Sequence, residues 1–398
     1  MYRDKFSNPV TSVYQEYYIS HQLHDRSPSD IAWIGSLQAF FLFAANIVGG
    51  PLFDRYGAKV RTVFWPSRTI SRLANNFHQI IWPAATAMVL SLMMTSLCKE
   101  YYQFILAQGV LGGIAIGLTM SPSMAAPAQY FQKKRGATMG LAVAGSSVGG
   151  VVFPIALGKM FANEALGFGW SVRIIGFTIM TCLAITCACI KSRLPPRKQN
   201  FLLFSAFKEP QFLVVITSAF MGIIGMFTPI FFLPSYAVSH GMDRVLASYL
   251  VAILNSASFF GRVLPGILSD KLGRFNVFAF SAISTGILTL CWQKATTNAG
   301  IIVFAAIFGF CSGAIVSSMA TCLTSIPKDP KNIGTYMGMG MGVASFGALA
   351  GPPINGALVD HYASFTQASI FSGIIVLAAG FTVLFGKLTT EKGILART

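Results

Sequence analysis

The stretch Gly50-Pro-Leu-Phe-Asp-Arg-Tyr-Gly57 returns 216 residues later as Gly266-Ile-Leu-Ser-Asp-Lys-Leu-Gly273. A second internal match has an offset of 198 residues. Its members are Gly136, Met139, Gly140, Ser147, Gly149 and Pro154, with the counterparts Gly334, Met337, Gly338, Ser345, Gly347 and Pro352. Two matches in the same chain order predict that the protein is built from two related halves.

Long uncharged stretches surround both copies of the motif. A helix that crosses the hydrocarbon layer of a membrane, about 30 Å thick, needs about 20 mostly apolar residues. Only helices and closed barrels satisfy the backbone in lipid, and these stretches are too long for barrel strands. The sequence therefore predicts an all-α, polytopic membrane protein. The stretches without Asp, Glu, Lys or Arg are 31–50, 80–98, 101–131, 136–158, 174–190, 210–239, 245–261, 275–293, 295–327, 332–359 and 362–386.

The positive charge of the chain is distributed unevenly between the two sides of the membrane. The chain is 54% hydrophobic and 11% charged, with a formal net charge of +16. When the stretches are threaded alternately, 21 of the 29 Lys and Arg fall on one side. Basic loops mark the cytoplasmic face. The charge therefore predicts topology, with contacts to anionic lipid on that side, and it does not indicate a nucleic-acid partner.

The two offsets differ by 18, so the first half carries extra residues between the two matches. We interpret residues 61–79 as an insertion, either a retained intron or a genuine loop, because loops tolerate changes of length. The second half has six stretches and the first has five, so we expect the first helix to be incomplete. The expected units are an N-terminal bundle (1–190), a cytoplasmic connector (191–208), a C-terminal six-helix bundle (209–390) and a tail (391–398).

The repeated motif lies on a tight loop between two helices in each half. Glycine permits close helix approach and positive φ, and a carboxylate near a helix end is held by helix termini and basic side chains. We therefore predict a charged latch in each half that breaks when the halves move. The alternative is that these charges only set topology. The predicted gating residues are Gly50, Asp54, Arg55, Gly57, Gly266, Asp270, Lys271, Gly273 and Arg274.

With these motifs, the chain resembles transporters of the major facilitator superfamily, and more narrowly their fungal monocarboxylate-transporter-like branch. The resemblance implies two six-helix bundles, here with eleven complete spans, around a central site reached by alternating access. The segments that carry it are Val13-Tyr-Gln-Glu-Tyr-Tyr18, Ser27-Pro-Ser-Asp-Ile-Ala-Trp-Ile-Gly-Ser36, Gly50 to Gly57, Arg193-Leu-Pro-Pro-Arg197, Ala206-Phe-Lys-Glu-Pro210 and Phe260-Gly-Arg262.

The resemblance implies a small organic acid or secondary metabolite as substrate, driven by its own gradient or by protons, in uptake or in efflux. It implies a multi-pass protein of the plasma membrane. Characterised animal members pair the arginine that matches Arg262 with an acid one turn earlier, where this chain has Ser258. The proton-and-lactate mechanism therefore does not carry over by analogy. A protein that keeps this fold without transport, degenerate or sensor-like, is the alternative function.

Three polar residues in or beside the apolar stretches are candidates for binding the substrate. Arg262 could bind a carboxylate through bidentate hydrogen bonds, or it could extend to the cytoplasmic surface. Asn255 lies seven residues earlier, about two turns along the same helix face. Gln38 is the third candidate, and for both amides the alternative role is helix packing.

The sequence contains no pattern typical of catalysis or of a bound cofactor. We find no metal-ligand spacing, no nucleotide-binding loop and no catalytic triad. The seven cysteines all fall within the apolar stretches, without a redox or metal motif. We therefore expect a protein that is not an enzyme, with no cofactor and no metal, whose partners are a small molecule and the lipid bilayer.

Overall fold

The computed structural model describes residues 14, 17–56, 81–161, 163, 165–190, 193–195 and 200–387, and these residues form helices and connecting turns without a strand. The N-terminal bundle contains η2 (Tyr18–Gln22), α2 (Pro28–Ala44), α3 (Asn46–Tyr56), α5 (Ile81–Thr95), α6 (Tyr101–Phe104), η3 (Ile105–Gly112), α7 (Gly113–Tyr130), α8 (Arg135–Phe161) and α9 (Gly167–Cys189). The expected insertion 61–79, the tail 391–398 and Gly57 lie outside the described residues.

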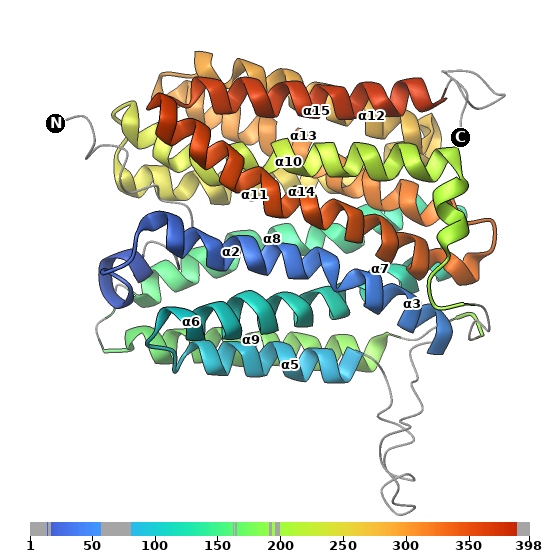
Figure 1. Ribbon diagram of the computed structural model, residues 1–398, viewed down its shortest axis with the longest axis horizontal. Coiled ribbons are helices and arrows are strands. Elements are labelled where there is room, and N and C mark those ends of the chain that lie inside the picture. Colours follow the sequence, from blue (N-terminus) through green and yellow to red (C-terminus); the bar gives the residue numbers. More distant parts are fainter. Residues whose placement is uncertain are drawn as a thin grey trace, which may run out of the picture.

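The C-terminal bundle follows the connector. It contains η4 (Phe204–Lys208), α10 (Pro210–Ser239), α11 (Arg244–Leu272), α12 (Arg274–Cys291), η5 (Trp292–Lys294), α13 (Asn298–Ser325), η6 (Pro330–Asn332), α14 (Ile333–Tyr362) and α15 (Thr366–Gly386). Figure 1 shows the two bundles side by side with their helices roughly parallel, the N-terminal one (blue to green) below the C-terminal one (yellow to red).

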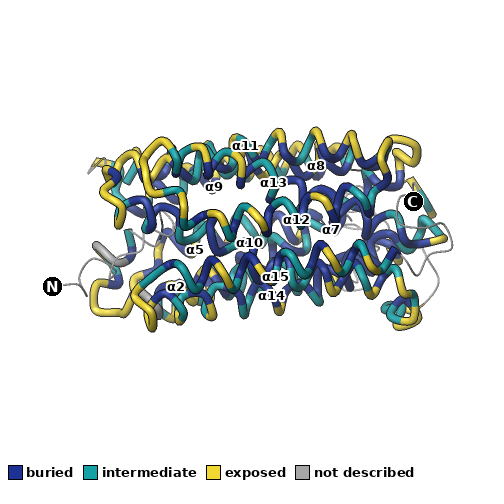
Figure 2. The backbone as a smooth tube through the Cα atoms, turned by 90° about the horizontal axis from the view of Figure 1, so that it is seen from above, coloured by how far each residue is buried: buried dark blue, intermediate teal, exposed yellow. Residues whose placement is uncertain are grey.

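The described residues contain ten helical segments long and apolar enough to cross a membrane, and α5 is a shorter apolar helix. These segments overlap the eleven uncharged stretches, which confirms the prediction of an all-α polytopic membrane protein. Many large apolar side chains point outward: Leu141, Phe280 and Phe385 are each more than 60% exposed. Figure 2 shows exposed positions recurring along the outer helices α8 and α11, as expected where a surface faces lipid and not water.

Side chains from the preceding turns fix where several helices begin. Ser27 and Asp30 form a reciprocal capping box at the start of α2, which satisfies two backbone N–H groups that the helix leaves free. Asp243 caps α11 through the N–H groups of Val245 and Leu246. Thr297 caps α13 through the N–H of Gly300. The loop residues that interrupt the apolar stretches are therefore also the residues that delimit the spans.

The loops at one end of the helices carry most of the described basic side chains, and we call it the basic end. It includes Lys133, Lys134, Lys271, Arg274 and Lys328. The bundles meet mainly in two places: α8 packs along α11, and α14 packs along α2 and α3. In Figure 1, α14 runs obliquely out of the upper bundle toward α3.

The hydrophobic core is shared at the basic end and divided at the opposite end. The largest buried cluster joins residues of both bundles, including Phe53 and Met139 with Phe212 and Met337. Toward the opposite end, a cluster around Trp292 contains only residues of the C-terminal bundle. A cluster around Tyr18 contains only residues of the N-terminal bundle. The bundles are therefore joined at the basic end and have separate cores at the other.

Candidate gate and substrate site

Asp54, near the end of α3, crosses to the other bundle and binds the first turn of α14. Its carboxylate accepts hydrogen bonds from the backbone N–H of Gly334 (3.1 Å) and of Thr335 (2.6 Å), and from the Thr335 hydroxyl (2.8 Å). The side chain is only 4% exposed. The first N–H groups of a helix have no partner within the helix and carry partial positive charge. Asp54 therefore caps a helix of the opposite half.

Asp270, the counterpart of Asp54, makes the reciprocal contact. It lies near the end of α11, and its carboxylate accepts hydrogen bonds from the N–H groups of Gly136 (2.8 Å) and Ala137 (3.0 Å) at the start of α8. The sequence suggested basic side chains of the same half as partners. Among the described residues, however, no ion pair within 4.0 Å joins Asp270 to Lys271 or Arg274. The two repeated motifs thus close the basic end by capping helices across the interface.

Arg135 adds a third polar contact between the bundles. Its side chain is buried, and Nη1 donates a hydrogen bond to the carbonyl of Thr324 (2.8 Å), in the last turn of α13. A cation is favourable there because the C-terminal end of a helix carries partial negative charge. The basic run 133–135 is among the loop residues whose charge predicts topology, and its composition does not indicate this contact. The one sequence signal for it is the position of Arg135 immediately before the repeated Gly136.

Glycines make these contacts possible by letting helix backbones touch. A Cβ on Gly266 would lie 2.8 Å from the Gly136 carbonyl oxygen and 2.9 Å from the Gly140 Cα. Gly50 stands in the equivalent position against Gly334 and Gly338 of α14. Gly273 joins α11 to α12 with a φ of 93°, a conformation that favours glycine. Of the other predicted gating residues, Arg55 is exposed and lies over the ring of its neighbour Tyr56.

Arg262 lies on the face of α11 that packs against α8. Its Nη1 donates to the carbonyl of Val143 (3.0 Å) and makes a short contact with the Ser146 hydroxyl. Its Nε is buried and has no hydrogen-bond partner among the described residues. The guanidinium therefore sits between the two bundles with an unused donor, and the described residues place no carboxylate within ion-pair distance of it.

The structure brings Asn255 and Arg262 onto one interface and leaves Gln38 elsewhere. Asn255 faces Gly150 of α8, where an added Cβ would lie 2.7 Å from its Oδ1, and its amide donates to the Val251 carbonyl (2.9 Å). Gln38 lies within the N-terminal bundle, where its backbone packs against Gly113. Two of the three candidates thus share the α8–α11 interface, and the third lies between helices of one bundle.

Comparisons with known proteins agree with this architecture. The family model of the Major Facilitator Superfamily matches residues 7–339 and 263–396. The aspyridones efflux protein apdF of Emericella nidulans is 48% identical over 381 residues, covering 96% of this chain and 74% of the relative. The agnestins efflux protein AgnL12 of Paecilomyces divaricatus is 36% identical, covering 97% of this chain and 84% of that protein.

Solved structures show the same fold at low sequence identity. The human organic anion transporter MFSD10 superposes with a TM-score of 0.68 at 14% identity, covering 93% of this chain and 88% of that one. The Escherichia coli fucose:proton symporter FucP has the same TM-score at 15% identity, covering 97% and 96%. At such identities the likeness concerns the fold alone, which is that of two helical bundles joined by a connector.

Proposed function

Because this chain belongs to the Major Facilitator Superfamily, whose members are transporters and not enzymes, we propose that it exports a small organic acid or acidic secondary metabolite by alternating access. Support for export comes from its similarity to fungal proteins named as efflux proteins for aspyridones and agnestins. We place the protein in the plasma membrane with its basic end in the cytoplasm, since basic loops remain on the cytoplasmic side.

The observation that carries the mechanism is the reciprocal capping at the basic end. Asp54 binds α14 and Asp270 binds α8, so each half holds a helix of the other. The separate cores at the opposite end fit a state that is closed to the cytoplasm and open to the exterior. Export requires the reverse state, in which both caps are released and the outer ends meet.

Arg262 is proposed to bind the acidic group of the substrate in that reverse state. When α8 and α11 separate, the guanidinium leaves Val143 and Ser146, and its donors then face the space between the bundles. A buried cation at membrane depth is costly unless it is paired, so an anionic ligand stabilises the open form. Guanidinium also matches a carboxylate with two parallel hydrogen bonds.

Vesicles that contain the purified protein test this role with a panel of acidic and neutral metabolites. We expect Arg262→Ala to lower the transport of acidic substrates at least about tenfold, because charge-assisted hydrogen bonds contribute about 1.5–3 kcal/mol. Arg244→Ala is the matched control: it removes an exposed arginine from the same helix, and we expect the rate of the parent. Equal transport of acidic metabolites by both variants rejects the proposal.

Repeating the assay with and without a pH gradient distinguishes proton-driven transport from transport down the substrate gradient.

A further inference from the structure

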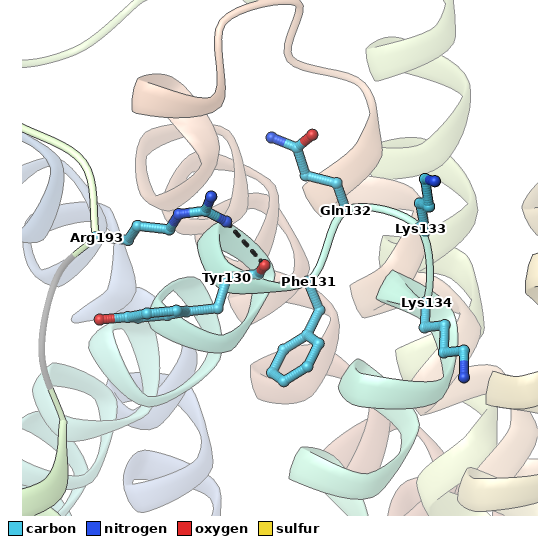
Figure 3. A pocket seen from close by; sticks show the side chains of 6 residues that line it. All are labelled: Tyr130, Phe131, Gln132, Lys133, Lys134 and Arg193. Carbon is cyan, nitrogen blue, oxygen red and sulfur yellow. Dashed lines mark hydrogen bonds between the residues drawn. The ribbon is translucent and has the colours of Figure 1, made fainter.

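A basic hollow lies at the membrane surface, apart from the interface between the bundles. It occupies about 330 Å³ where α7 ends and α8 begins, and it is lined by Tyr130, Phe131, Gln132, Lys133, Lys134 and Arg193. Figure 3 shows Arg193 reaching to the carbonyl of Tyr130, with Lys133 and Lys134 further along the same loop. None of the described residues that line it is acidic.

One residue of the connector between the bundles, Arg193, lines this hollow. Arg193 donates from Nη1 to the carbonyl of Tyr130 (3.0 Å) and, at 3.5 Å, to that of Gln129. These carbonyls end α7 and lack partners within the helix, so Arg193 fastens the connector to this helix. Within the part of the chain that the structure describes, its other nitrogens make no hydrogen bond, and they remain available to a ligand.

Among the described residues, no acidic side chain neutralises the positive charge of the hollow. Lys133 and Lys134 are exposed, and neither they nor Arg193 forms an ion pair among the described residues. The neighbouring Arg135 is directed elsewhere, to the Thr324 carbonyl of the other bundle. Arginine and lysine are the usual protein ligands of phosphate groups, so three cations without a carboxylate partner among the described residues attract a ligand that carries one.

Two exposed aromatic side chains place this phosphate site at the membrane surface. Tyr130 is 45% and Phe131 is 53% exposed, and both lie at the end of the membrane span that α7 completes. Aromatic residues concentrate where a span meets the headgroups. A soluble phosphate compound would gain little from this apolar border, whereas a phospholipid could place its acyl chains beside it.

We propose that the hollow binds the headgroup phosphate of an anionic phospholipid in the cytoplasmic leaflet. The phosphate lies in the hollow that Lys133, Lys134 and Arg193 line, and Tyr130 and Phe131 contact the upper acyl chains. The site immediately precedes the first turn of α8, which the carboxylate of Asp270 caps. The lipid therefore binds the segment that leads into the gate without occupying the gate itself.

The full chain, purified in a neutral detergent, tests this site with dioctanoyl phosphatidylserine as the probe. We expect saturable binding by the parent, and no comparable binding of dioctanoyl phosphatidylcholine. Each basic residue contributes about fivefold to the attraction of an anionic membrane surface, so the double variant Lys133→Gln/Lys134→Gln should weaken binding about 30-fold. Both side chains are exposed, so their loss leaves the packed core unchanged.

A matched double variant controls for charge. Lys328→Gln/Lys331→Gln removes two lysines from the α13–α14 loop, the counterpart of the α7–α8 loop in the other bundle, and should bind as the parent does. Equal weakening by both double variants would mean that only net charge matters, and it would overturn the proposal.

Glycerophosphoserine, which has the headgroup without acyl chains, distinguishes a site for a phospholipid from a site for a soluble phosphate compound. If it bound as tightly as the lipid, the site would be one for soluble phosphate compounds.

Discussion

Asp54→Asn is expected to reduce transport to a few per cent of the parent rate. Asparagine keeps one acceptor oxygen but presents an NH₂ group to the N–H groups of α14, so the change loses both charge and hydrogen bonds. Hydrogen bonds to a charged group contribute about 1.5–3 kcal/mol each. A loss of about 3 kcal/mol shifts the equilibrium between closed and open gates on the order of 100-fold. Transport of an acidic metabolite by vesicles is the first measurement.

The distance between spin labels at positions 25 and 243 reports the conformation directly. Asp25 precedes α2 and Asp243 precedes α11, both exposed at the end opposite the basic end. We expect the distance to shorten in Asp54→Asn, because the outer ends approach when the gate opens. Asp360→Asn removes an exposed carboxylate from the opposite end of α14 and should leave rate and distance unchanged. If Asp54→Asn also leaves both unchanged, the capping contact does not control the gate.

The spans and the two halves could be predicted from the sequence because each depends on a local pattern. Uncharged runs long enough to cross a membrane predict helices wherever they occur. The repeated spacing of Gly and Asp identifies equivalent positions in the two halves without any knowledge of how the helices pack. The capping turns at Ser27, Asp243 and Thr297 are equally local. The spans and caps depend on residues within a few positions of one another, and the two halves are recognised by comparing two such local patterns 216 residues apart.

The partners of the repeated carboxylates could not be predicted in the same way. Asp54 and Gly334 lie 280 residues apart, and the motif does not specify which helix of the other half would face it. The sequence indicated helix termini and neighbouring basic side chains as partners without specifying which helix, so the expected latch stayed within each half. The second match contained the missing information: Gly136 and Gly334 are the helix starts that the two carboxylates cap, and both are members of that match.

For the candidate substrate site, helix periodicity was informative within one element only. The seven-residue spacing of Asn255 and Arg262 predicted a common face, and both do face α8. Gln38 lies on another helix, and no spacing relates it to α11. From the sequence, Arg135 is one more basic loop residue that sets topology. An exposed basic residue and one at the interface between the bundles have the same sequence context, and only the burial of Arg135 distinguishes the two roles.

The second prediction concerns Gly50, whose Cα lies against the backbone of α14. A Cβ at this position would collide with the Gly334 carbonyl oxygen and lie 2.8 Å from the Gly334 carbonyl carbon and 3.2 Å from the Gly338 Cα. All three are backbone atoms, so no side chain can rotate away and the helices must separate. Overpacking of this kind costs about 1–3 kcal/mol, and only in the state where α3 and α14 touch. Gly50→Ala should therefore disfavour the closed basic end by about 5- to 150-fold and lower transport to about one-fifth of the parent rate or less.

Gly145→Ala provides the matched control, because a Cβ there meets nothing within 4 Å and alanine is a better helix former than glycine. It should fold at least as well as the parent and transport at the same rate. Gly50→Ala should instead shorten the distance between labels at positions 25 and 243, as Asp54→Asn does. Because both changes weaken the same α3–α14 contact at Gly334, their effects are coupled, and the double variant should lose less transport than the product of the two single losses. Parent-like transport and distance in Gly50→Ala would show that the transport cycle does not require α3 and α14 to touch at Gly50.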